Sequence, residues 1–135
     1  MNTIKIKKYV DVVEERVCGS TAITPGMLVE LEAAGTVKPH ASADAAVEKA
    51  FALEDELQGK TIADNYTDGN PVQIFFARPG DVVYGIMDSG VTPAVGSFVQ
   101  SNGDGKLKAL DSGTNIGVVL EGKDTTTHRV KIRVV

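Results

Sequence analysis

Residues 72–87 read VQIFFARPGDVVYGIM, which is two apolar runs separated by a four-residue turn signal. The runs at 72–77 and 82–87 are rich in β-branched and aromatic residues, which are typical of short strands. Pro79 stands where a proline favours the start of a β-turn. This part of the chain is therefore predicted to form two strands joined by a tight turn.

The same alternation of short apolar runs and turn residues continues on both sides of this stretch. Further strands are predicted at 27–31, 37–39, 98–100, 106–110, 116–120 and 128–135. Along the last of these, apolar residues are predicted to point inward and basic residues outward, namely Val130, Ile132 and Val134 against Arg129, Lys131 and Arg133. Turn signals at such short intervals are typical of sandwiches and barrels. The predicted fold class is therefore all-β, a small β-barrel or sandwich of short strands.

An internal two-fold repeat is indicated by stretches that resemble one another. The counterparts are Thr24-Pro25 with Thr92-Pro93, GTVK at 35–38 with GKLK at 105–108, and AFALE at 50–54 with VVLE at 118–121. We expect two similar halves, each of which covers an apolar face that the other leaves unpaired.

Residues 42–57 are compatible with two structures. Small and apolar residues fall on one face of a helix that Ser42 could cap, namely Ala43, Ala46, Val47, Ala50, Leu53 and Leu57. Alternatively, the chain forms a loop to about residue 47 and then a short strand at 49–53. The repeat favours a strand at 51–53, with at most one short helical turn near 54–58.

Composition limits the classes of protein that the chain can represent. Its 135 residues suffice for one domain, and the net charge of −4 speaks against a general nucleic-acid binder. Cys18 is the single cysteine, so an intrachain disulfide is impossible and a structural zinc site is not expected. No apolar run is long enough to span a membrane and no signal peptide is expected, so we predict synthesis in a reducing cytoplasm.

Motifs for catalysis or cofactor binding are weak. Residues 100–111 match a calcium loop only in part, and a glycine-rich hairpin turn explains them better. Ser89 and Ser112 stand in Asp-Ser-Gly triplets without an evident histidine partner, although a Ser–Lys dyad stays open. The acidic run at 54–56 is expected to be solvated. We therefore predict no enzyme activity, no catalytic residue, no cofactor and no metal.

The N-terminal residues 3–13 alternate in a way that predicts a strand with one wet face. Ile4, Ile6, Val10 and Val12 would lie on one side and Lys5, Lys7, Tyr9 and Asp11 on the other, with Lys8 breaking the pattern. Basic residues of this strand and of 128–135 could form a stripe that docks on an acidic partner or that merely protects sheet edges. The candidate partner-binding residues are Ile4, Lys5, Ile6, Lys7, Lys8, Tyr9, Val10, Val12, Arg129, Lys131 and Arg133.

The order of motifs over residues 23–135 resembles the capsid decoration, or cement, proteins of tailed bacteriophages. The motifs are TPGMLVEL at 24–31, GTVKP at 35–39, FALE at 51–54, RPGD at 78–81, IGVVLE at 116–121 and the closing alternation at 130–134. The resemblance implies a barrel domain at 21–135 that binds the major capsid protein on the outside of an expanded shell. It also implies an N-terminal arm at 1–20 that reaches to neighbours.

Such proteins are often homotrimers at junctions between capsomers, and they stabilise the DNA-filled head. The resemblance thus implies a protein made in the cytoplasm of a bacterial host and located on the capsid exterior, without direct contact to nucleic acid or membrane. A receptor- or carbohydrate-binding module of a phage fibre or tail is the alternative. Aromatic residues at 5%, with no Trp, supply few of the rings that carbohydrate sites favour.

Overall fold

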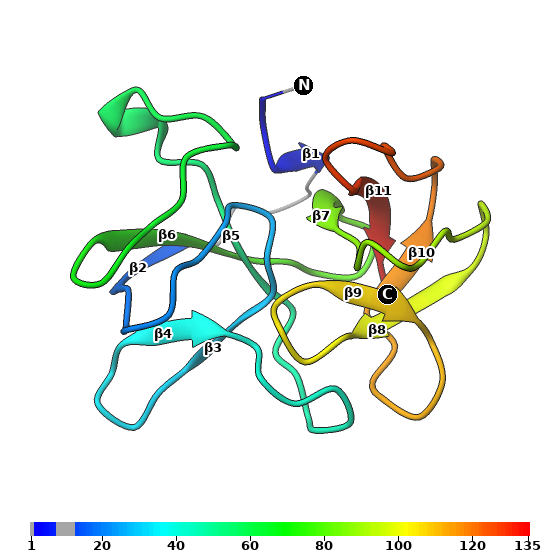
Figure 1. Ribbon diagram of the computed structural model, residues 1–135, viewed down its shortest axis with the longest axis horizontal. Coiled ribbons are helices and arrows are strands. Elements are labelled where there is room, and N and C mark those ends of the chain that lie inside the picture. The colour runs from blue at the N-terminus through cyan, green and yellow to red at the C-terminus, as the bar shows by residue number, and fades with distance from the viewer. Residues whose placement is uncertain (1, 8–12) are drawn as a thin grey trace.

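A computed structural model describes residues 2–7 and 13–135, and it is all-β (Figure 1). The strands are β1 (Lys5–Lys7), β2 (Val13–Val17), β3 (Val29–Leu31), β4 (Val37–Pro39), β5 (Ala50–Ala52), β6 (Pro71–Phe76), β7 (Val82–Ile86), β8 (Phe98–Ser101), β9 (Leu107–Ala109), β10 (Gly117–Val119) and β11 (Arg129–Val134). One 3-10 turn, η1 (Glu56–Gln58), is the single helical element of these residues. None of the described residues belongs to a helix long and apolar enough to cross a membrane.

Three sheets organise the described strands. Six strands pair in the order β1-β7-β11-β10-β8-β9, three in the order β2-β6-β5, and β3 pairs with β4. Isolated bridges outside these strand pairs join Leu28 to Phe51, Cys18 to Val37 and Met87 to Leu107. Within the described residues no sheet closes into a complete barrel, so the arrangement is sandwich-like and the barrel alternative is corrected.

The internal repeat is confirmed by the pairing of the strands. The first half contains β2 to β6 and the second contains β7 to β11, and Figure 1 shows the two halves side by side. Strands β3 and β4 pair Val29 with Pro39, and β8 and β9 pair Val99 with Ala109 in the same register. The pairs β5–β6 and β10–β11, and the pairs β2–β6 and β7–β11, are also equivalent.

Two of the single bridges occur at equivalent positions in the two halves as well. Cys18 directly follows β2 and forms a parallel bridge with the first residue of β4, whereas Met87 directly follows β7 and forms one with the first residue of β9. Gly35 and Gly105, which the sequence repeat pairs, both adopt positive φ in their hairpins. Every core strand of one half therefore has a counterpart in the other.

The stretch 72–87 forms the two predicted strands and the predicted turn, but its strands belong to different sheets. The Asp81 N–H donates to the Arg78 carbonyl at 3.0 Å, and the Asp81 carboxylate accepts from the Arg78 N–H at 2.9 Å. Strand β6 lies in the first half and β7 in the second. This turn is thus the covalent connection from one half to the other.

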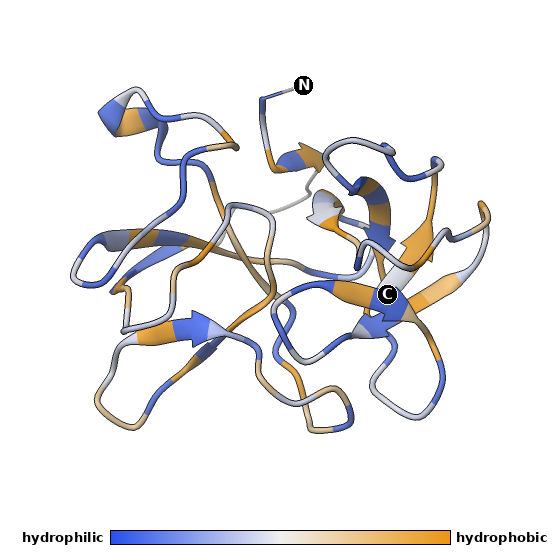
Figure 2. Ribbon diagram, in the orientation of Figure 1, coloured by the Kyte–Doolittle hydropathy of each residue, from blue (hydrophilic) through white to orange (hydrophobic). Residues whose placement is uncertain are grey.

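Two clusters of apolar side chains form the core. The cluster of the first half contains Cys18, Ile23, Val29, Val37, Ala50, Ala52, Tyr66, Val72 and Ile74. The larger cluster contains the interior of the second half together with Ile4, Leu28, Phe51, Leu53 and Phe75 from the rest of the chain. Figure 2 shows apolar and polar residues alternating along β11, where Val130, Ile132 and Val134 are buried as predicted.

The two alternatives for residues 42–57 are resolved in favour of the strand. Residues Ala50–Ala52 form β5 and the only helical turn there is η1, so the amphipathic helix is wrong. Side chains of β5 are buried on both faces, because Phe51 packs toward the second half while its two neighbours pack inside the first. Burial on both faces produced the apolar pattern that a helix would also show.

Tyr66 supplies a test of the core through the pH dependence of stability. Its hydroxyl donates to the Leu53 carbonyl at 2.6 Å, and burial raises the pKa of this hydroxyl far above its usual range. Because the pKa is higher in the folded state, stability is complete below about pH 10, the unfolded value, and falls as the pH rises further.

We expect denaturant midpoints of the wild-type protein to fall between about pH 10 and 12 more steeply than those of Tyr66→Phe. The phenylalanine variant cannot ionise, and it is less stable at neutral pH because the Leu53 carbonyl loses its donor. Parallel losses in the two proteins across this range would contradict the assignment.

Candidate functional site: two surfaces that the repeat leaves open

The predicted N-terminal strand is bonded to its own chain where the structure describes it. Ile4 is fully buried, its N–H donates to a Glu54 carboxylate oxygen at 2.9 Å, and its carbonyl accepts from the Tyr84 N–H at 2.8 Å. Lys5 pairs with Val83, and its Nζ lies 5.9 Å from the centre of the Phe75 ring.

These contacts place residues 4–7 against the second half. Ile6 is half-buried, and Lys7 pairs with Val82 in the ladder. Lys8, Tyr9, Val10 and Val12 lie outside the described residues. The division into an arm at 1–20 and a domain at 21–135, and the partner-binding role of these residues, stay predictions.

Arg129 corrects the predicted basic stripe. The sequence pattern places this residue outward, but it is 6% exposed. Its guanidinium donates to the Pro25 carbonyl and, at 2.7 Å, to the Ile62 carbonyl, and it lies 6.0 Å from the Tyr84 ring. Burial lowers the pKa of Arg129 from its ordinary value. Arg129 therefore fastens the first half to the second.

The remaining stripe residues of β1 and β11 do not lie on neighbouring strands, although Lys7 and Arg133 both pair with Val82 of the strand between them. Strand β7 separates β1 from β11 in the sheet. On β11, Lys131 forms an ion pair with Glu121 at 3.0 Å, while Arg133 is exposed. Of the predicted stripe, Arg133 is thus the basic residue of β11 that faces solvent without a partner in the described ion pairs.

A buried histidine pairs with a serine that the sequence did not single out. The Nδ1 atom of His40 lies 2.7 Å from Ser101 Oγ, and its Nε2 lies 3.2 Å from the Ala46 carbonyl. Both side chains are almost completely buried. Ser112 instead donates to Asp44 at 2.6 Å. The contact of His40 with Ser101 therefore joins the first half to the second.

Metal ligands are not assembled in the described part of the chain. No group of three or more His, Cys, Asp or Glu side chains comes together there. The partial calcium loop is the β8–β9 hairpin, in which Gln100 is fully buried. The Gln100 side-chain oxygen accepts from the Asp111 N–H at 2.7 Å and from the Gly113 N–H at 2.8 Å. Its role is to support the hairpin.

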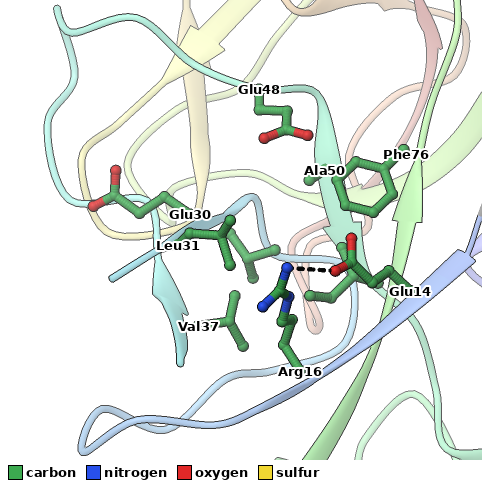
Figure 3. A pocket seen from close by; sticks show the side chains of 10 residues that line it. Glu14, Arg16, Glu30, Leu31, Val37, Glu48, Ala50 and Phe76 are labelled. Carbon is green, nitrogen blue, oxygen red and sulfur yellow. Dashed lines mark ion pairs between the residues drawn. The ribbon is translucent and has the colours of Figure 1, made fainter. Parts of the chain in front are cut away.

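The first half has an open mouth, which we define by its lining residues (Figure 3). Its floor is apolar and consists of Val29, Val37, Ala50 and Ile74, and its rim consists of Glu14, Arg16, Glu30, Leu31, Glu48 and Phe76. Arg16 forms an ion pair with Glu14 at 2.6 Å, and its Nε is buried without a hydrogen-bond partner in the described structure. Lys38 Nζ lies 3.6 Å from Glu30, so three rim carboxylates stand against two cations, Arg16 and Lys38, and the net charge of the rim is slightly negative.

The second half has an exposed row of side chains across its sheet. The register places Leu110, Phe98, Val118 and Arg133 side by side on successive strands. Phe98 is 48% exposed and Leu110 37% exposed, whereas Val118 is half-buried. Large exposed apolar side chains that adjoin one another mark an interaction surface. We call this set the exposed row.

Comparison with known proteins supports the fold. No family model and no curated protein matches the chain. Among solved structures, the chain is similar to the N base of the head fiber protein gp8.5 of bacteriophage phi29, with a TM-score of 0.63 and 13% identity. The similarity covers 93% of this chain and 95% of that chain. At this identity the likeness shows a similar fold over nearly the whole length of both chains.

Proposed function

We propose that the chain is a structural protein of a tailed-phage particle that binds the outside of the head and stabilises the filled capsid at junctions between capsomers. The observation that carries this proposal is the fold, which over nearly its whole length is similar to the base of a phage head fiber. The order of turn motifs that resembles capsid decoration proteins supports the same class independently of the structure.

The architecture suits a protein that acts by binding. Its two halves share one continuous hydrophobic cluster, so the molecule can transmit load between partners as a rigid body. The major capsid protein is the proposed partner, and contacts of one assembly with several capsid subunits would strengthen one another through effective concentration. We propose no enzyme activity, and the buried His40–Ser101 pair accords with this proposal.

Electron cryo-microscopy of purified particles that encode this chain tests the proposal. We expect density for the fold on the outer surface of the mature head, at junctions between capsomers, in a fixed ratio to the shell protein. A mature head without this density would overturn the proposal. Heads that lack the chain should also release their DNA at lower temperature or lower chelator concentration than complete heads.

A receptor- or carbohydrate-binding module of a fibre is the second candidate, because the similar structure is part of a head fiber and not of the capsid shell itself. The copy number in the particle separates the two candidates. A chain that covers capsomer junctions is present in a fixed ratio to the shell protein, whereas a chain at the ends of fibres is far rarer. Binding of the purified protein to defined glycans on an array would support the second candidate.

A further inference from the structure

The two halves contact one another through a row of side chains on the first half, which packs against the end of the second half. In the first half, the register aligns His40, Leu28, Phe51 and Phe75 across the strands, and all four are buried. The Leu28 N–H donates to the Gly105 carbonyl at 2.9 Å, and His40 meets Ser101 as described. Leu28, Phe51 and Phe75 of this covered row pack in one cluster with the interior of the second half.

The repeat gives each member of this contact a counterpart elsewhere on the chain. The covered row His40, Leu28, Phe51 and Phe75 corresponds to the exposed row Leu110, Phe98, Val118 and Arg133. The buried mouth residues Val83, Gly85, Gln100 and Ser101 correspond to the open mouth residues Glu14, Arg16, Glu30 and Leu31. One row–mouth contact is therefore made within the chain, and among residues 2–7 and 13–135 nothing pairs with the second row or the second mouth in this way.

At some positions the exposed row and the open mouth carry other residue types than their counterparts in the contact between the halves. These differences make the two open surfaces complementary to one another. His40 bonds Ser101 inside the chain, and their counterparts are Leu110, 37% exposed, and Leu31, 54% exposed. A polar pair is thus replaced by an apolar pair, which burial would stabilise.

The exposed row and the open mouth also differ from their buried counterparts in charge, and their charges are opposite. The basic residue Arg133 stands where the covered row has Phe75, and the carboxylates Glu14 and Glu30 stand where the buried mouth has Val83 and Gln100. Phe75 and Val83 lie in one cluster, with Lys5 paired to Val83 and lying over the Phe75 ring. A row docked in the same way would bring Arg133 to the acidic rim.

We propose that the exposed row of one chain packs on the open mouth of a second copy of this chain, repeating between copies the contact that joins the two halves. The surfaces differ, so the contact is head to tail and continues from copy to copy until a ring closes. The homotrimer predicted from the sequence would be one such ring. This inference concerns self-association and stands apart from any capsid contact.

Two single substitutions test the exposed row and the open mouth one at a time. Leu110→Asp blocks the row and Leu31→Asp blocks the mouth, and both sites are exposed enough to accept a charge in the folded monomer. Leu57→Asp is the matched control, because Leu57 is 83% exposed on η1 and belongs to neither surface. Circular dichroism and denaturant midpoints are the controls for correct folding of each variant.

Sedimentation velocity over a concentration series gives the readout. We expect oligomers for the wild type and Leu57→Asp, and at least about tenfold weaker association for each blocked variant, which is about 1.4 kcal/mol. An equimolar mixture of the two blocked variants retains one intact row and one intact mouth, so it should form a dimer and stop there. A monomeric wild type, an unaffected blocked variant or a monomeric mixture would each overturn the proposal.

Discussion

Replacing Phe51 by alanine should lower the free energy of unfolding by about 3–5 kcal/mol. Phe51 is fully buried in the cluster that joins the halves, and removal of its ring would leave a cavity that fixed strands on both sides cannot fill. The loss should be visible as a lower denaturant midpoint and a lower melting temperature.

Phe98→Ala is the matched control, since Phe98 corresponds to Leu28, the pairing partner of Phe51, but is half-exposed. At concentrations where the chain is monomeric, this variant should lose no more than about 1 kcal/mol. Equal losses from Phe51→Ala and Phe98→Ala would mean that the halves are not packed as described.

Replacing Arg129 by methionine should destabilise the protein by about 2–4 kcal/mol. Methionine keeps much of the aliphatic volume but leaves the Pro25 and Ile62 carbonyls without the guanidinium that now donates to them. The effect should appear in chemical denaturation near neutral pH, where the guanidinium is charged.

Arg133→Met provides the comparison, because it changes the same residue type on the same strand at an exposed position. Its effect on monomer stability should stay within about 0.5 kcal/mol. If both arginine variants were equally stable, the bonds of Arg129 across the halves would contribute nothing to the fold.

The repeat was predictable because turns constrain residue type more than strands do. Gly35 and Gly105 both need positive φ, so the same residue recurs in both hairpins and the neighbouring valine and leucine keep their register. A few such positions were enough to predict two similar halves. The single bridges between strands, and the fact that the sheets stay open, depend on strand twist and on single contacts, which leave no periodic signal in the sequence.

The position of Arg129 shows what alternation cannot predict. A period of two correctly places this residue on the face opposite Val130 and Ile132, but a face is exposed only if nothing covers it. Here the carbonyls of Pro25 and Ile62, far away in sequence, reach over β11 and enclose the guanidinium. The same limit applies to Ile4, whose alternation predicts a strand but does not identify β7 as its partner.

The open mouth and the exposed row could not be derived from the sequence, because each combines residues from several strands in a defined register. Leu31 and Leu110 give a weak sequence signal of a binding surface. Each is an apolar residue beside a polar hairpin turn, where folding does not require an exposed leucine. Their significance emerges only when the strand register identifies Ser101 and His40 as their counterparts in the repeat.

The N-terminus and the turn at 78–81 together determine how the molecule would respond to a protease. Strand β1 belongs to the sheet of the second half although the chain then continues into β2 of the first half. Arg78 and Pro79 are exposed at the tip of the connecting turn. A cut there would break the backbone, but Ile4 and its neighbours would stay hydrogen-bonded to β7 in the C-terminal fragment. The nicked molecule should therefore migrate as one particle until a denaturant separates its pieces.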